Sequence, residues 1–434
     1  MITTDGLVRV GRSARLATLV VMSAIGGGVG AAMAQTPATV QVAVTGRSNE
    51  SVSVAADGQF VAMVWGASTT GGMDVFSAVS RDGGATFTSP VRVNAVAFDA
   101  RVGGEQPPHV VLVPRRGAAP SLVVVWTAKR AEGSRLLMAR SDDGGVSFGA
   151  TTVVPGTAAT GNRGWESVTA NARGGVHVLW LDHRDLPATP HQHGAVATSG
   201  PAAPAPDSVE RASYSKLYVA SLDGSTPPKA ITGNVCYCCK TSFVAGSDGT
   251  LYGVWRHVYP GDLRDIALTS SRDGGRTFSA PLRVSEDHWE FDGCPDNGPS
   301  LAVDGARRVH VVWPSPADVK DPRVMALYYA VSRDGAAFAP RVRVPTAGPA
   351  GHVQVIADSD RGLVVAWEEM TAAGRSVVVA RGTTDAVGRA SFRRVGTAET
   401  GRYPSLAATS TGVVMAWTST QNGANVISVR RIGS

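Results

Sequence analysis

Charged and aromatic residues are scarce in this chain of 434 residues, and their scarcity excludes whole classes of protein. They make up 18% and 6% of the sequence, and the formal net charge is only +6. No dense run of Lys and Arg is interleaved with aromatic residues, so we expect no nucleic-acid partner. What the chain has in abundance is glycine, with 50 residues, and short stretches rich in valine. This composition is typical of an all-β protein with many turns.

Long apolar runs are also missing beyond the first 34 residues. Within those residues, three arginines precede an apolar run at 16–33, and Ala32-Met33-Ala34 fits a small-x-small cleavage site. The pattern predicts a signal peptide at residues 1–34, and the glycines that interrupt it argue against a retained membrane anchor. We therefore expect an exported protein, periplasmic or secreted, with no membrane span after signal removal. Losing three Arg and one Asp lowers its net charge from +6 to +4.

One eight-residue turn recurs along the chain. Ser80–Phe87 reads SRDGGATF, and closely similar octets stand at 141–148 and 271–278, with a decayed copy at 332–338. Apolar alternation precedes the octets, so we expect each to follow a β-strand. Glycine supplies positive φ at such a turn, and Asp accepts hydrogen bonds from the turn amides. The repetition predicts an array of similar units.

A second repeat is more regular than the first. Short apolar segments that end in tryptophan recur at intervals of 50 to 75 residues. The seven tryptophans are Trp65, Trp126, Trp180, Trp255, Trp313, Trp367 and Trp417. Each unit can be read as four strands, and such units arranged radially make a β-propeller. We expect residues 35–434 to form a single all-β propeller domain with seven blades, six being the alternative. The segment Thr39–Val44 is left over, and pairing with the last unit would close the ring.

The octets resemble the Asp-box (BNR) repeats of the sialidase-like propellers, and the resemblance extends over nearly all of the chain after residue 34. It implies that Asp82, Asp143 and Asp273 are structural, because the family's turns lie on the face opposite the active site. The activity that it implies is that of an exo-sialidase, or of a related glycoside hydrolase that acts on acidic sugars.

A sialidase binds the substrate carboxylate with three arginines, and it uses a Tyr–Glu pair as nucleophile and an Asp as acid/base. The family's early Arg-Ile-Pro motif is missing here. The catalytic candidates that match part of the set are Arg163, Glu166, Asp265, Arg402 and Tyr403. Because the complete set cannot be assembled, we expect no true sialidase activity. Exo-sialidase activity and a non-catalytic scaffold that binds protein or glycan remain the alternatives.

Residues capable of chemistry gather on the loops of one face. If the octet turns occupy one end of every blade, the other loops meet at the opposite end, and all four cysteines fall in or beside those loops. A Pro/Ala-rich insertion at about 186–210, which contains His191 and His193, would form a flap there. We expect a monomer that binds a small molecule or glycan near blades three to five. The expected binding residues are Lys240, Arg264, Asp265, Trp289, Asp296 and Asn297.

The cysteines allow two interpretations. Four cysteines in an exported protein ordinarily form disulfides, and one bond from the C-x-C-C cluster to Cys294 is easy to form. A bond between Cys238 and Cys239 would be strained, which leaves two thiols unexplained. The other interpretation is a soft-metal site for zinc or for copper as Cu(I). Its ligands would be Cys236, Cys238, Cys239, Cys294, His257 and His288. Both interpretations stay open, and so does a mixture of the two.

Overall fold

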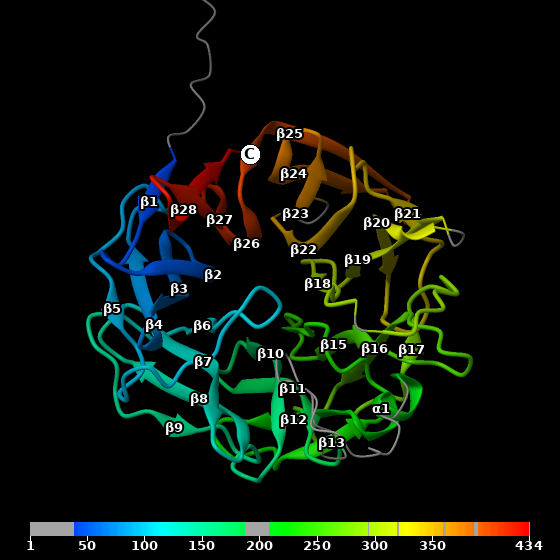
Figure 1. Cartoon of the computed structure of the whole chain (residues 1–434), viewed down its shortest axis with the longest axis horizontal. Helices are drawn as coiled ribbons and strands as arrows, with labels where there is room; N and C mark the ends of the chain where they lie inside the picture. Colours follow the sequence, from blue (N-terminus) through cyan, green and yellow to red (C-terminus); the bar gives the residue numbers. More distant parts are fainter. Residues whose placement is uncertain are drawn as a thin grey trace, which may run out of the picture. The chain divides into compact units, whose positions relative to one another are not determined.

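The computed structural model describes residues 39–186, 208–293, 295–318, 321–358, 362–385 and 389–433. The strands of these residues form seven four-stranded antiparallel sheets, the blades of a propeller (Figure 1). The prediction of an all-β propeller with seven blades is therefore confirmed, and the six-bladed alternative is wrong.

The blades follow one another along the chain, each with its strands in order except the last. Blade one is β2 (Ser48–Asp57), β3 (Phe60–Thr69), β4 (Gly72–Ser80) and β5 (Val91–Arg92); blade two is β6 (His109–Val113), β7 (Ser121–Arg130), β8 (Gly133–Ser141) and β9 (Thr152–Val153); blade three is β10 (Asn162–Ala170), β11 (Val176–His183), β12 (Lys216–Ser221) and β13 (Lys229–Thr232). Blade four is β14 (Ser242–Ala245), β15 (Leu251–Arg256), β16 (Ile266–Ser271) and β17 (Leu282–Arg283); blade five is β18 (Ser300–Val303), β19 (Val309–Asp318), β20 (Asp321–Ser332) and β21 (Val342–Arg343). Blade six is β22 (Ala350–Ala357), β23 (Gly362–Thr371), β24 (Gly374–Thr384) and β25 (Ala390–Thr400); blade seven is β26 (Arg402–Thr409), β27 (Gly412–Gln421), β28 (Ala424–Ile432) and β1 (Val40–Val42).

The ring closes through the first strand of the chain. β1 pairs antiparallel with β28, with Val40 opposite Val429 and Val42 opposite Ile427. The segment left over in the repeat count therefore supplies the fourth strand of blade seven, as predicted. The first strand of each blade contacts the first strand of the next, and β26 contacts β2. Closure leaves the ring without an open edge between its first and last blades.

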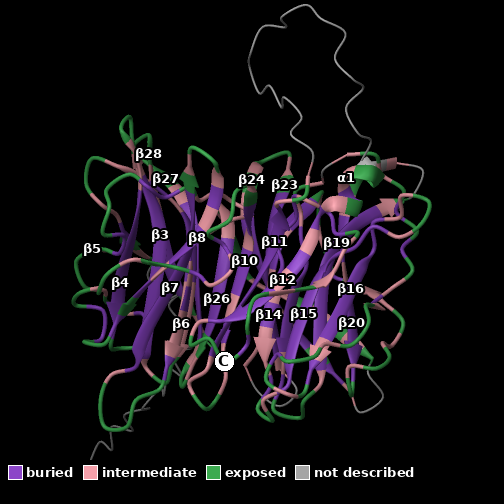
Figure 2. Ribbon diagram, turned by 90° about the horizontal axis from the view of Figure 1, so that it is seen from below, coloured by how far each residue is buried: buried purple, intermediate pink, exposed green. Residues whose placement is uncertain are grey.

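The repeated tryptophans hold neighbouring blades together. All seven are fully or almost fully buried, and each packs against the preceding blade. Trp126 of blade two, for example, shares a core with Val64 and Val75 of blade one, and Trp65 packs against Val414 of blade seven. Figure 2 shows the result as buried strands between two exposed rims of loops. The tryptophan repeat thus reflects the packing of each blade against its neighbour.

The octet turns connect the third and fourth strands of their blades. In the first, Asp82 Oδ1 accepts hydrogen bonds from the backbone N–H of Ala85 at 3.0 Å and of Thr86 at 2.9 Å. Gly84 has a φ of 87° and donates its N–H to Ser80 Oγ at 2.8 Å. These contacts are local to the turn, so the turn serves the fold. Because strands alternate in direction, the loops that lead from one blade to the next lie at the opposite end.

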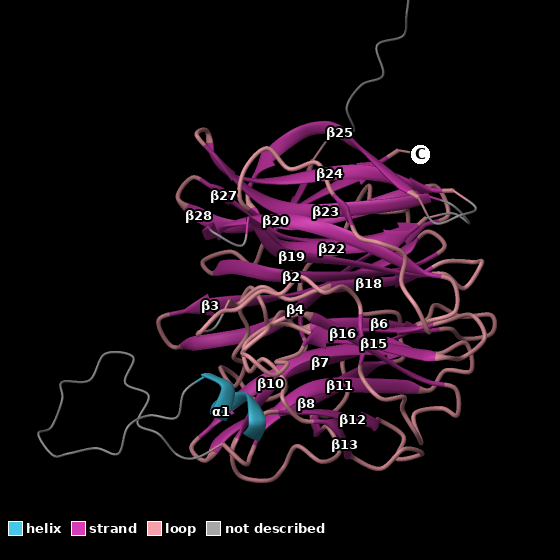
Figure 3. Ribbon diagram, turned by 90° about the vertical axis from the view of Figure 1, so that its right-hand side faces the viewer, coloured by secondary structure: helices cyan, strands magenta, loops and turns pink. Residues whose placement is uncertain are grey.

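Two predicted segments fall largely outside the described residues. The predicted signal peptide, residues 1–34, is one of them, and most of the insertion at 186–210, with His191 and His193, is the other. The end of that insertion forms α1 (Ser208–Tyr214), which the sequence reading missed (Figure 3). In the described ranges, no helix is long and apolar enough to cross a membrane.

Candidate functional site

A pocket of about 140 Å³ opens where the first strands of the blades converge. Every one of these strands, from β2 to β26, contributes at least one residue to its wall. The polar side chains of the wall include His109, Ser167, Lys240, Ser300, His352 and Tyr403. A pocket with several convergent polar groups is the candidate place for a small ligand.

Glu105 joins three blades beside this pocket. It lies on the loop between β5 and β6, which reaches toward the middle of the ring (Figure 1). Its Oε1 is 2.7 Å from Nδ1 of His352. Its Oε2 accepts hydrogen bonds from the backbone N–H of Lys240 at 3.0 Å and of Gly298 at 2.9 Å. A Cβ atom at residue 298 would collide with the Lys240 backbone, so only glycine allows this close approach.

The groups around Glu105 form a buried ion pair. Burial alone would raise the pKa of Glu105, but the hydrogen bond from His352 and the charges of Lys240 and His352 lower it. Burial opposes the charged form of His352 as well, yet the carboxylate of Glu105 raises the pKa of the imidazole. Lys240 donates from Nζ to the carbonyl of Val353 at 2.8 Å, and burial lowers its pKa.

Two further carboxyl groups near the pocket have raised pKa values, close to neutral pH. Burial raises the pKa of Glu166 to about 7. Thr127 donates to its Oε2 at 2.9 Å, whereas Oε1 is buried with no hydrogen-bond partner. Burial and then the charge of Glu105 raise the pKa of Asp296 to about 6. His109, in contrast, stays neutral, because burial and the charge of Lys240 lower its pKa to about 4.

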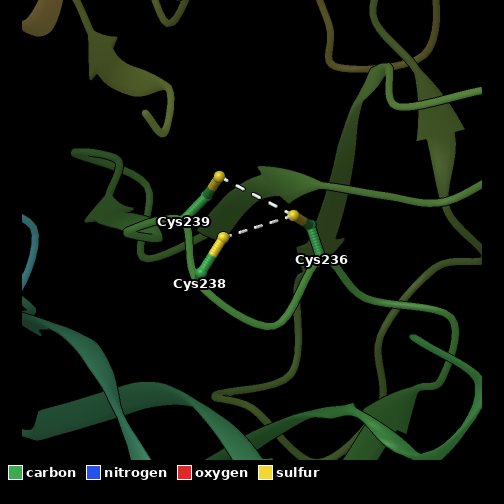
Figure 4. A group of neighbouring side chains, drawn as sticks. All are labelled: Cys236, Cys238 and Cys239. Carbon is green, nitrogen blue, oxygen red and sulfur yellow. Dashed lines mark hydrogen bonds between the residues drawn. The ribbon is translucent and has the colours of Figure 1, made fainter. Parts of the chain in front are cut away.

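Three cysteine sulfur atoms meet on the loop between β13 and β14. The Sγ atoms of Cys236, Cys238 and Cys239 all lie within 4.8 Å of one another. Figure 4 shows Cys236 facing the other two, with Sγ–Sγ distances of 3.9 Å to Cys238 and 3.7 Å to Cys239. Cys236 and Cys239 are free thiols, and Cys238 is disulfide-bonded. Cys294, the fourth cysteine of the chain, lies outside the described residues.

Positive charge and hydrogen-bond donors surround the two free thiols. Arg264 Nη1 donates to Cys236 Sγ at 3.4 Å, and the backbone N–H of Asn297 donates to Cys239 Sγ at 3.4 Å. The hydrogen bond from Cys239, then the charges of Arg264 and Arg256, lower the pKa of the Cys236 thiol to about 6. Burial, followed by the Cys236 sulfur, raises the pKa of Cys239 well above its ordinary value. These shifts favour a thiolate at Cys236 beside a thiol at Cys239.

The sulfur cluster and the pocket are adjacent parts of one site. Lys240 follows Cys239 directly and lines the pocket. Asn297 donates to Cys239 on one side, and on the other its Oδ1 accepts the backbone N–H of His352 at 3.0 Å. Its carbonyl also accepts a hydrogen bond from Arg256 at 3.0 Å. Blades two, four, five and six therefore meet at this site.

The described structure brings some of the predicted ligands together and leaves others apart. Neither His257 nor His288 belongs to the group of three sulfurs. Nδ1 of His257 lies 3.3 Å from Nε1 of Trp255, and His288 pairs with Glu286 at 3.8 Å on the surface. Asp265 and Trp289 contact each other, and Trp289 also contacts Arg256. Asp265 accepts a hydrogen bond from the backbone N–H of Trp289 at 3.4 Å, and the Trp289 ring lies 4.7 Å from the Arg256 guanidinium.

The arginines proposed for a carboxylate clamp do not converge. Arg163 is buried and uses its guanidinium on backbone carbonyls and on Asp182, 3.3 Å away. Arg402 pairs with Glu50 at 3.4 Å, and Arg264, one of the expected binding residues, donates to Cys236. Among the described residues, no arginine lines the pocket. Tyr403 does line it, but burial raises the pKa of the phenol, which is opposite to what a nucleophile requires.

Three residues in or beside the pocket carried no clear signal in the sequence. Glu105 stands in a loop with no motif, and neither His109 nor His352 belongs to a motif or to one of the repeats. Glu105 is buried and His352 is largely buried because the ring brings distant blades together. A carboxyl-bearing residue in a glycine-rich loop, such as Gly103-Gly104-Glu105, was the one local signal available.

Known proteins match this chain in fold only. No protein-family profile and no curated protein match its sequence. Among solved structures, an α-L-arabinanase of Penicillium chrysogenum in complex with arabinobiose is 12% identical, with a TM-score of 0.51 over 91% of this chain and 98% of that one. The polysaccharide lyase Uly1 is 9% identical, with a TM-score of 0.50 over 90% and 91%. A Trypanosoma rangeli sialidase is 12% identical, with a TM-score of 0.48 over 91% of this chain and 60% of that one. The first two structures are thus similar to this chain in their propeller fold, and the similarity concerns the fold alone.

Proposed function

We propose that this chain is an exported, sialidase-like propeller that binds a soft metal ion through its cysteine loop, next to a pocket for a small ligand. The observation that carries the proposal is a cluster of three buried sulfur atoms. Cys236 Sγ lies 3.7 Å from Cys239 Sγ and 3.9 Å from Cys238 Sγ. A metal–sulfur bond of about 2.3 Å puts two sulfurs of one tetrahedral centre roughly 3.8 Å apart. The 3.7 Å separation of the two free thiols, Cys236 and Cys239, therefore suits a shared metal ion.

The surroundings of the sulfurs support the same proposal. Thiolates that bind a metal commonly accept hydrogen bonds from neighbouring N–H groups, which orient and stabilise them. Arg264 and Asn297 provide one such donor to each free thiol. Cys238 would become a third thiolate only when its disulfide is reduced. Copper as Cu(I) and zinc are the ions that prefer such donors.

Metal analysis of the purified protein tests the proposal. The full chain is expressed so that the cell exports it, and it is then purified without chelator under anaerobic conditions. Elemental mass spectrometry measures the bound metal. We expect close to one equivalent of copper or zinc in the wild type and far less in Cys236→Ser and Cys239→Ser. A Ser225→Ala variant, altered at an exposed turn, is the matched control. Metal-free wild-type protein that does not take up copper or zinc would refute the proposal.

Glycan binding, with or without hydrolysis, is the second candidate function. The observation that favours it is the buried Glu166, whose raised pKa of about 7 keeps a proton available near neutral pH, as a general acid requires. The pocket beside it is polar and carries the aromatic ring of Tyr403. Since arginines are absent from the described pocket wall, neutral sugars suit it better than sialic acid.

Chromogenic glycosides distinguish these functions. An arabinofuranoside and a sialoside are tested against wild type and Glu166→Gln. Arabinofuranoside turnover that disappears in the variant would support hydrolysis, whereas binding without turnover would support a scaffold. Sialoside turnover would contradict our expectation that the chain is not a true sialidase.

A further inference from the structure

The cysteine loop contains a two-thiolate pair hidden in its C-x-C-C sequence. Cys236 and Cys239 are the free thiols, and they are closer to each other, at 3.7 Å, than Cys236 is to Cys238. The sequence spacing of this pair is therefore C-x-x-C. Cys238 points its sulfur to the same centre but is already in a disulfide.

The number of available donors discriminates between the two soft ions. Zinc sites in proteins are almost always four-coordinate. Among the described residues, the group holds three sulfurs and no imidazole nitrogen or carboxylate oxygen. Cu(I), a d10 ion with a single charge, forms stable complexes with two or three thiolates and needs no further ligand.

The charge and polarity of the surroundings favour Cu(I) as well. A Cu(I) ion with two thiolates carries a net charge of −1, and a buried anion requires a compensating charge. Arg264 is fully buried and touches Cys236, and Arg256, also buried, lies near both free thiols. Several further neighbours of the sulfurs are apolar: Ala212, Val258, Trp165 and Tyr237. A water-poor shell of this kind shields Cu(I) from oxidation and from competing oxygen ligands.

Resting on the proposed metal-binding function, the geometry points to Cys236 and Cys239 as a Cu(I) site that holds one ion as a dithiolate. The ion displaces the one thiol proton that the pair still holds, at Cys239, and this proton passes to solvent. Lys240 lines the pocket, and Asn297 links Cys239 to His352 of the pocket wall, so the site and the pocket are adjacent.

Competition for Cu(I) with bicinchoninate tests the inference on the full chain, anaerobically and without added reductant. The coloured Cu(I) bis-bicinchoninate complex loses one copper per chain to the wild type, and near-ultraviolet thiolate-to-copper absorption appears. Cys236→Ser and Cys239→Ser withdraw at least tenfold less copper. Reduction of the Cys238 disulfide leaves the stoichiometry at one. Zinc, offered in a parallel competition with a zinc-sensitive dye, is withdrawn far less well.

Each alternative result has a defined meaning. Withdrawal of zinc but not of copper overturns the Cu(I) site and leaves the proposed soft-metal function standing. Withdrawal of neither metal overturns both. If a serine variant fails to fold, as judged by its thermal transition, the near-ultraviolet absorption of the wild type decides the question. Copper that is taken up without thiolate-to-copper absorption is bound elsewhere in the protein, and the inference is then wrong.

Discussion

Oε1 of Glu105 lies 2.7 Å from Nδ1 of His352, although 247 residues separate the two along the chain. The contact joins the loop before blade two to the first strand of blade six across the pocket. Both side chains are largely buried, with 3% and 19% of their surface exposed, so the pair is shielded from solvent. The pocket thus depends on an ion pair that forms only in the closed ring.

Replacing Glu105 by Gln should destabilise the fold strongly. The variant leaves the buried imidazolium of His352 without its carboxylate, and breaking a buried pair costs about 3–5 kcal/mol. Chemical denaturation measures the loss. Glu132→Gln is the matched control, because Glu132 pairs with Arg135 at the surface and such pairs contribute at most about 1 kcal/mol. Equal losses in the two variants would contradict the importance of the pair.

The same pair predicts a window of pH in which it stabilises most. The pKa of Glu105 is lowered from 4.5, so its contribution is complete above that pH and is lost as pH falls through the folded value. The pKa of His352 is raised from 6.5, so its contribution is complete below that pH and is lost as pH rises through the folded value. The stability difference between wild type and Glu105→Gln should therefore be largest between about pH 4.5 and 6.5. A difference that is independent of pH would argue against an ion pair.

Glu166 should destabilise the protein increasingly as pH rises. Its pKa moves from 4.5 in the unfolded chain to about 7 in the fold, so stability falls across this interval, by up to about 3 kcal/mol. Glu166→Gln removes the ionisation and should be more stable than wild type at pH 8. Denaturation at pH 5 and pH 8 checks this prediction. A variant that loses stability at pH 8 would mean that the carboxylate is charged and paired in the fold.

The blade tryptophans should differ in what they contribute. Trp180 Nε1 donates to the buried carboxylate of Asp182 at 2.9 Å, whereas Trp126 Nε1 is buried with no partner in the described structure. Exchange for Phe leaves a similar gap at both sites. Loss of the hydrogen bond to Asp182 should make Trp180→Phe costlier than Trp126→Phe by about 1–3 kcal/mol. Thermal denaturation of both variants is the comparison, and the reverse order would be evidence against these contacts.

The fold was more accessible from the sequence than the site. The tryptophan spacing predicts the number of blades, because each blade needs one indole to pack against the preceding blade. The number of tryptophan segments in the sequence therefore equals the number of blades. The unpaired segment at Val40–Val42 followed from the same count. The Cys236–Cys239 loop was visible for a similar reason, since its residues are neighbours in sequence.

The pairing of Glu105 with His352 could not be read in the same way. Neither residue belongs to a repeat, and the two meet only because seven blades complete a circle. The position of His257 illustrates the opposite error. Its place on the expected loop face suggested a ligand, but the short-range contact with Trp255 holds its ring outside the sulfur group. Loop position alone does not determine where a side chain points.

Oxidation of the two thiols to a disulfide should abolish metal binding. Diamide accepts two electrons and two protons as its N=N bond is reduced to the hydrazide, and the thiols of Cys236 and Cys239 supply them by forming a disulfide. Their 3.7 Å separation in the fold favours this bond. Peptide mapping by mass spectrometry should find it, and the oxidised protein should no longer take up copper. Unchanged copper uptake after complete oxidation would contradict a site built on these two thiols.

X-ray absorption at the metal edge of the copper-loaded chain tests the central claim most directly. The account predicts a first shell of two sulfur atoms at about 2.2–2.3 Å, close to the usual metal–thiolate distance, and no light-atom shell. The same spectrum from Cys239→Ser should lose this sulfur shell. A first shell of nitrogen or oxygen at about 2.0 Å in the wild type would contradict the claim that the cysteine loop binds the metal.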